Sequence, residues 1–118
     1  MIKGLNHINY FATDLLRAKK FYTTVLDLKL AFDSSDAFSV ELGKGNWMII
    51  AKTENNGKDI GKGSVVVLWV DHLKDCLEDF KNRGVLVLKE IYESPAGLFA
   101  HIQDSEGNMI KLYEGPHG

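Results

Sequence analysis

The feature that most constrains the fold is a succession of one strand, one helix and three strands that occurs twice along the chain. In each half, an alternating apolar stretch precedes an amphipathic helical stretch, and three short strand-like stretches follow. Asp14 and Asp71 each precede a helical stretch, and their separation is close to that between the Gly-Asn pairs at 45–46 and 107–108. The sequence therefore predicts a loosely duplicated βαβββ unit.

The local patterns place the individual elements. The predicted strands are residues 5–11, 28–32, 38–42, 47–52, 64–70, 86–91, 98–103 and 109–113. The first helix is predicted to begin at an N-cap of Thr13 or Asp14 and to end near Leu26. Asp71 is predicted to cap the second helix, and Gly84 suits the position after its end. The apolar stripe of the second helix follows helical spacing through Leu73, Cys76, Leu77 and Phe80.

The chain length indicates a single domain made of two modules. At 118 residues the chain can bury a core of its own. We expect a first module at about 1–53, a polar, glycine-rich linker at about 54–63, and a second module at about 64–115. Between the last two strands, residues 104–108 predict a tight turn in which Gly107 and Asn108 are best able to adopt positive φ.

Composition limits the partners. Apolar residues make up 45% and charged residues 25% of the chain, and the net charge is −2. These values are ordinary for a soluble globular protein, and without a basic stripe they predict no nucleic-acid partner. Neither a signal-peptide core nor an apolar stretch of bilayer length is visible, so we expect no membrane association. The single cysteine fits a reducing cytoplasm.

Three stretches resemble those of a known superfamily: His7-Ile8 with 14–15 and 21–22, Val70-Asp71 at the second helix, and DSEGNMIKLYE at 104–114. The last is similar to the signature DPDGNxIELxE of the vicinal oxygen chelate superfamily. This superfamily includes glyoxalase I, bleomycin-resistance proteins, fosfomycin-resistance proteins and extradiol dioxygenases. The resemblance implies an α+β fold in which two tandem βαβββ modules form a curled mixed sheet around a shared cavity, with the helices outside. It also implies a homodimer.

The resemblance further implies a divalent metal held by residues on the first and last strands of each module. His7 stands at the first of these positions, but Lys111 replaces the glutamate of the signature. A lysine ammonium has no lone pair to offer a metal. Val65 or a neighbour stands at the third position, and residues 47–51 supply no ligand at the fourth. We therefore expect the usual metal site to be missing and no cofactor to be bound.

Strand alternation also predicts which side chains line the cavity. They are His7, Asn9, Ser39, Glu41, Trp69, Phe99, His101, Lys111 and Tyr113. Two interpretations of the polar members remain open. His7, Glu41 and His101 could form a relocated divalent-metal site, or Glu41 could pair with Lys111 in the cavity wall. Trp69 would supply an aromatic wall, or it would simply pack on its sheet.

The function predicted first is metal-independent binding of a small organic molecule, sequestered or sensed and not transformed, as in the bleomycin-resistance branch. Lys111 would anchor a negative group of the ligand, or it would only extend to the cavity rim. The alternative is a metal-dependent lyase, isomerase or dioxygenase with an atypical site around His7. Whether the chain is an enzyme stays open, with binding favoured. A purely structural domain would leave the shared face of His7, Glu41, His101 and Lys111 without a role.

Overall fold

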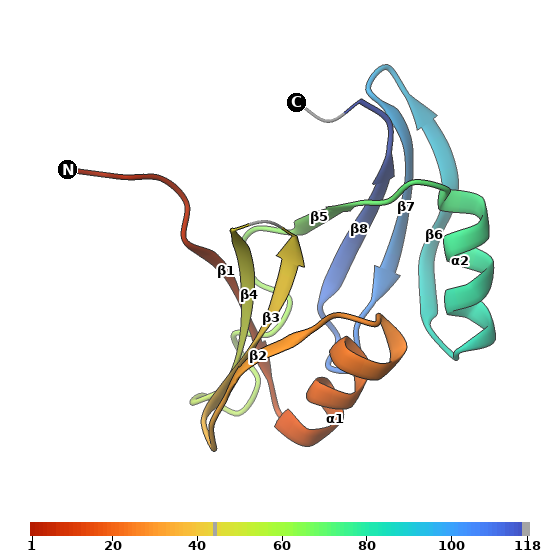
Figure 1. Cartoon of the computed structure of the whole chain (residues 1–118). Coiled ribbons are helices and arrows are strands. Elements are labelled where there is room, and N and C mark those ends of the chain that lie inside the picture. The colour runs from red at the N-terminus through yellow and green to blue at the C-terminus, as the bar shows by residue number, and fades with distance from the viewer. Residues whose placement is uncertain (44, 117–118) are drawn as a thin grey trace. The chain divides into compact units, whose positions relative to one another are not determined.

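The computed structural model describes residues 1–43 and 45–116 (Figure 1). The chain divides into two compact units, the first comprising Met1–Ile60 and the second beginning at Gly61. This division falls within residues 54–63, the stretch predicted as a linker. The predicted sheet is in fact two separate four-stranded sheets, one in each unit.

The first unit contains a mixed sheet with one helical segment. Its strands are β1 (His7–Ala12), β2 (Leu30–Asp33), β3 (Ala37–Gly43) and β4 (Asn46–Lys52). They lie in the order β1-β4-β3-β2. The pairing of β1 with β4 is parallel, and the other pairings are antiparallel.

The helical segment of the first unit changes character along its length. It begins as α1 (Leu15–Lys20), where the backbone N–H of Arg17 donates to Oδ1 of Asp14 at 3.0 Å. Asp14 is therefore the N-cap, as one of the two predicted alternatives. The segment continues as the π-helix η1 (Phe21–Val25). The wider turn buries Phe21 and Tyr22 together, with their ring centroids 5.3 Å apart.

The second unit repeats this topology, which confirms the predicted duplication. It contains β5 (Val66–Trp69), α2 (Leu73–Asn82), β6 (Leu86–Ser94), β7 (Gly97–Gln103) and β8 (Met109–Glu114). The strand order is β5-β8-β7-β6, with β5 parallel to β8 and the other pairs antiparallel.

The start of α2 differs from the prediction. His72, not Asp71, is the N-cap residue, and its side chain makes no capping hydrogen bond. The N–H of Leu73 instead donates to Oε1 of Glu114 at 2.7 Å. A side chain 41 positions away thus caps the helix, which no local pattern could indicate. At the other end, Gly84 has φ +86° directly after the C-cap, as predicted.

The turn between β7 and β8 is built on buried polar groups. Gly107 has φ +97°, as expected, but the described non-glycine residues with positive φ are Asp27 and Asn56. The expectation for Asn108 was therefore wrong. Asn108 is instead buried, and its N–H and Nδ2 donate to the Asp104 carboxylate at 2.8 and 2.9 Å.

Each unit buries one face of its sheet against its own helix. The main buried sheet residues are Phe38, Val40, Met48 and Ile50 in the first unit, and Val66, Ala100, Ile102, Ile110 and Leu112 in the second. Ala18 and Tyr22 lie against the first sheet, and Leu73 and Leu77 lie against the second. Strand alternation directs the residues between these toward the opposite face of each sheet. Most of the predicted site residues lie there.

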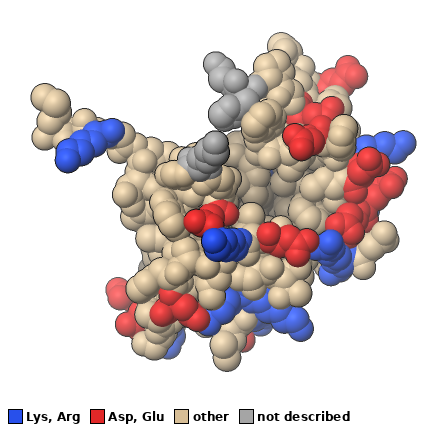
Figure 2. All heavy atoms as spheres, in the orientation of Figure 1, with Lys and Arg blue, Asp and Glu red and all other residues tan. Residues whose placement is uncertain are grey.

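The surface carries charges of both signs. On the face shown in Figure 2, acidic and basic side chains are interspersed. No helix among the described residues is long and apolar enough to cross a membrane.

Candidate functional site

Four aromatic side chains form a row across the second sheet, on the face turned away from α2. Trp69 on β5 pairs with Tyr113 on β8, Tyr113 pairs with Phe99 on β7, and Phe99 pairs with Tyr92 on β6. Directly paired residues share a face of a sheet. The ring centroids of Phe99 and Tyr113 are 5.0 Å apart, and those of Tyr92 and Phe99 are 5.8 Å apart in a stacked arrangement. We call these four residues the aromatic row.

The polar ends of this row are held by backbone carbonyls. Nε1 of Trp69 donates to the carbonyl of Gly115 at 3.0 Å, and 54% of the Trp69 residue surface stays exposed. The Tyr113 hydroxyl lies 2.8 Å from the carbonyl of Ala96 and 2.9 Å from that of Pro116. These bonds fix the orientation of both rings, so the row is a preformed apolar surface.

A second row, with cationic and imidazole groups, lies beside the first. Lys111 on β8 pairs with His101 on β7, and His101 pairs with Lys89 on β6. The hydroxyl of Tyr92 lies 2.7 Å from Nε2 of His101, and Nζ of Lys89 lies 4.2 Å from the centroid of the Tyr92 ring. We call Lys111, His101 and Lys89 the cationic row. Together with the aromatic row it forms one surface, here the aromatic face.

The electrostatics of the cationic row favour neutral His101. Burial lowers the pKa of His101, and the positive charges of Lys111 and then Lys89 lower it further. The positive charge of this row at neutral pH therefore comes from the two lysines. In the part of the chain that the structure describes, neither lysine has an ion-pair partner.

In the first unit, the predicted site residues have more separate environments. His7 is exposed, with Nδ1 2.9 Å from Oδ1 of Asn6. His7 pairs with Trp47, and Trp47 pairs with Glu41 on its other side. His7 and Glu41 are thus two strand spacings apart, about 10 Å, with an indole between them. Oε2 of Glu41 lies 3.8 Å from Nζ of Lys29.

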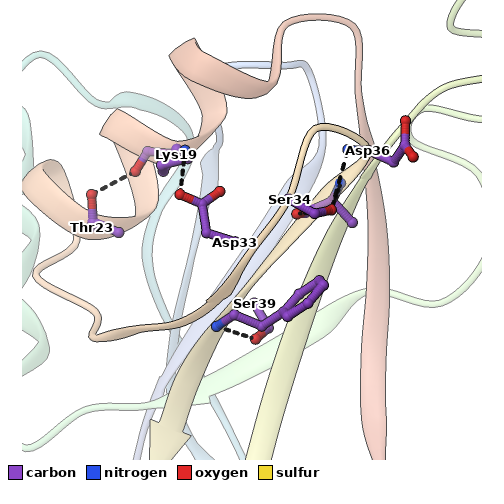
Figure 3. A network of polar contacts seen from close by, with 8 residues as sticks. Lys19, Thr23, Asp33, Ser34, Asp36 and Ser39 are labelled. Atoms are coloured by element: carbon purple, nitrogen blue, oxygen red, sulfur yellow. Dashed lines mark hydrogen bonds and ion pairs between the residues drawn. The ribbon is translucent and has the colours of Figure 1, made fainter.

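Ser39 has a structural contact in the first unit. Only 6% of it is exposed, and its Oγ accepts a hydrogen bond from the N–H of Phe32 at 3.1 Å. Figure 3 shows this bond together with the Lys19–Asp33 ion pair of 2.8 Å. The bond lies where the register of β2 against β3 shifts, so it satisfies a backbone group that the irregular ladder leaves open. Asn9, also predicted for the site, is exposed on β1.

The structure thus brings together five of the predicted residues, all in the second unit: Trp69, Phe99, His101, Lys111 and Tyr113. Any site that combines them with residues of the first unit, including the pairing of Glu41 with Lys111, stays a prediction. The sequence interpretation missed Tyr92 and Lys89. The register of β6 shifts on both sides of Lys89, so simple alternation along the sequence could not place them on this face.

The residues at the metal positions do not fit a divalent ion. The strand registers pair His7 with Trp47 and Val67 with Lys111, so Val67, rather than Val65, lies opposite Lys111. An indole offers only an N–H donor, and valine and lysine offer no lone pair. Among residues 1–43 and 45–116, no group of three or more His, Cys, Asp or Glu residues is placed to hold a metal.

Two recesses are lined by residues outside the aromatic face. One of about 1020 Å³ in the first unit has Phe11, Ala37 and Ala51 among its lining residues, with Asp36 and Asp59 contributing carboxylates. The other, of about 320 Å³, lies between α2 and β6. Neither recess is lined by any of the predicted site residues.

Comparison with known proteins supports one family. The sequence matches the Glyoxalase/Bleomycin resistance protein/Dioxygenase superfamily over residues 4–112. Similar structures include TnmS3, an antibiotic binding protein from Streptomyces sp. CB03234, with a TM-score of 0.84, 21% identity and 98% coverage of both chains. Another is lactoylglutathione lyase from Agrobacterium tumefaciens, with a TM-score of 0.76, 16% identity, and coverage of 97% of this chain and 95% of that chain.

A member of the same superfamily from Sphaerobacter thermophilus DSM 20745 is also similar, with a TM-score of 0.83, 20% identity, and coverage of 96% of this chain and 98% of that chain. At these identities the structural likeness concerns the fold. No curated protein matches the sequence. Since the family match spans nearly the whole chain and the fold agrees with it, the protein belongs to the glyoxalase/bleomycin resistance protein/dioxygenase superfamily.

Proposed function

We propose that this protein binds a small organic molecule on the aromatic face of its second sheet, without a metal and without transforming it. The observation that carries this proposal is the aromatic row, which places one ring from each of four adjacent strands side by side. A continuous set of ring faces offers a planar ligand a large apolar contact at little entropic cost, because the rings are already held in place.

The chemistry at the metal positions favours binding over catalysis. Structures similar to this chain include both an antibiotic binding protein and a lactoylglutathione lyase, so the fold by itself does not distinguish binding from catalysis. The superfamily's metal-dependent reactions need ligands that converge on an ion, and the register sets Trp47, Val67 and Lys111 at those positions. A small molecule that is only sequestered or sensed needs no metal-coordinating side chains.

The cellular setting is part of the same proposal. We place the protein in the cytoplasm, supported by its single cysteine, and we propose a homodimer, supported by the family resemblance. Exposed apolar side chains on the edge strand β6, such as Leu86 and Leu88, would be suited to an interface between copies.

Tryptophan fluorescence tests the binding surface. The probe is the carboxamide of fluorenone, a flat neutral molecule that quenches indole emission on contact. In a Trp47→Phe background, which leaves Trp69 as the emitting indole, we expect saturable quenching by this probe. Trp69→Ala in the two-tryptophan protein should remove most of the response. An undiminished response in Trp69→Ala would place the binding surface elsewhere and contradict the proposal.

A further inference from the structure

We propose that the ligand is a planar aromatic acid, whose rings stack on the aromatic row and whose carboxylate or sulfonate binds Lys111. This inference rests on the proposed function and adds a substrate class to it. It follows from the position of the cationic row beside the aromatic row, and from the lack of acidic partners for that row among the described residues.

The two rows are close enough for one molecule to contact both. Tyr113 and Lys111 are two positions apart on β8, and Phe99 and His101 are two positions apart on β7. Residues two apart on a strand face the same side and lie about 7 Å apart. An acidic substituent on a fused-ring ligand spans this distance, so rings centred on Phe99 and Tyr113 direct their substituent toward Lys111.

Lys111 is the group in the cationic row that is open to a ligand. It is half-buried, between Val67 and His101 in the cross-strand pairing, and its side chain makes no hydrogen bond or ion pair within the described part of the chain. Lys89, by contrast, already lies over the Tyr92 ring. A half-buried ammonium without a partner loses part of its hydration free energy, and an anion placed beside it compensates for that loss.

Charge complementarity therefore distinguishes an acid from other occupants of the same face. A neutral polycyclic ligand would use the aromatic row and leave Lys111 without a counter-charge. A cationic ligand would be repelled by both Lys111 and Lys89. A second copy of this chain is the competing occupant that the experiment must distinguish, because it would cover the same face at high protein concentration.

Three fluorenone probes of matched shape test the inference: the carboxylate, the carboxamide and the aminomethyl derivative, which is cationic. Their affinities are measured by titration calorimetry at low salt for the parent protein, Lys111→Met and a control, Lys74→Met. Lys74 lies on α2, on the opposite side of the second sheet, and is exposed. Methionine keeps most of the lysine stem and removes the charge.

We expect the carboxylate to bind most tightly, the carboxamide less tightly and the aminomethyl derivative most weakly. Lys111→Met should weaken carboxylate binding by roughly three- to thirtyfold and leave the carboxamide nearly unchanged, as for a partly exposed charged hydrogen bond. Lys74→Met should match the parent for all three probes. Added salt should weaken binding of the carboxylate more than binding of the neutral carboxamide.

The outcomes that overturn the inference are distinct from those that overturn the proposed function. Equal affinities for carboxylate and carboxamide, or no effect of Lys111→Met, would reject the acidic class while leaving stacking on Trp69 intact. Failure of all three probes to bind would reject both proposals. If Trp69→Ala or Lys111→Met altered self-association in sedimentation without altering probe affinity, a second copy would be the occupant, which also rejects the inference.

Discussion

His101 shows how a single residue reports on the aromatic face. Its imidazole accepts or donates one hydrogen bond with the Tyr92 hydroxyl and lies between two lysines in the cross-strand pairing. Two ammonium groups near an imidazole disfavour its protonation, since like charges in a partly dehydrated site repel one another. Burial lowers the pKa of His101 most, and the charges of Lys111 and Lys89 lower it further, so a change in this pKa reports a change in the charge that a ligand would meet.

The first prediction concerns this pKa. Removing the Lys111 charge in Lys111→Met should raise the pKa of His101, since Lys111 lowers it in the parent protein. The pKa should stay below the ordinary histidine value, because burial is the largest cause of the shift and remains. NMR titration of the imidazole carbon-bound protons measures it directly.

The same titration contains its own control. Lys74→Met changes a residue on α2, away from this face, and should leave the His101 pKa unchanged.

A bound carboxylate probe should raise the pKa of His101. The affinity of the probe should therefore increase as pH falls through the range where His101 becomes protonated. The other titratable groups on this face are Lys111 and Tyr113 on β8 and Lys89 and Tyr92 on β6. A fall in the His101 pKa in Lys111→Met would contradict the assignment.

At the scale of the element, the start of α2 depends on a strand of the same unit. Glu114 is the last residue of β8, and its carboxylate accepts the N–H of Leu73 in the first turn of the helix. An acidic group at this end also interacts favourably with the helix dipole. The contact ties α2 to the sheet that it covers, beside the end of the aromatic row.

The second prediction uses this contact. Glu114→Ala should lower the free energy of unfolding by about 0.5–2 kcal/mol, as for loss of an N-cap. Urea denaturation followed by circular dichroism measures the change. Asp71→Ala is the matched control, since Asp71 occupies the position that local sequence favours but is not the residue that caps. Equal losses in the two variants would show that the Glu114 contact contributes nothing.

At the scale of the whole molecule, two units of the same topology carry different side chains on corresponding faces. The β1–β4 pair of the first unit presents His7 beside Trp47, and the β5–β8 pair of the second presents Val67 beside Lys111. Divalent-metal sites need several lone-pair donors converging on one ion. The two units therefore share their strand pairing, while three of the four metal positions carry Trp47, Val67 and Lys111, which have no lone pair to offer an ion.

The third prediction follows from that donor set. Protein purified and dialysed without added metal should contain far less than one equivalent of Zn, Ni, Mn or Fe per chain. Elemental analysis by mass spectrometry measures the content, with His7→Ala as the comparison. About one equivalent of metal in the parent, lost in His7→Ala, would support the enzyme alternative and contradict the metal-independent proposal.

The sequence by itself determined the elements and their order, because these depend on periodicity and local chemistry. The resemblance of its signature stretches indicated the family. The apolar spacing of the helices, the Asp14 cap and the glycine at position 107 each act within a few residues of themselves. Strand alternation also placed Trp69, Phe99, His101, Lys111 and Tyr113 on one face, since period two survives wherever a strand is regular.

Only the tertiary structure decided the contacts between residues far apart in sequence. The shifts in the register of β6 put Tyr92 and Lys89 beside His101, and no periodicity encodes such a shift. Glu114 caps α2 from 41 positions away. Asn108 lies only four positions from Asp104, but burial makes it a hydrogen-bonding residue instead of a positive-φ turn residue. The cap and the turn share one physical reason. A backbone N–H at a helix end or in a buried turn needs a polar partner, and the fold decides which side chain lies within hydrogen-bond distance of it.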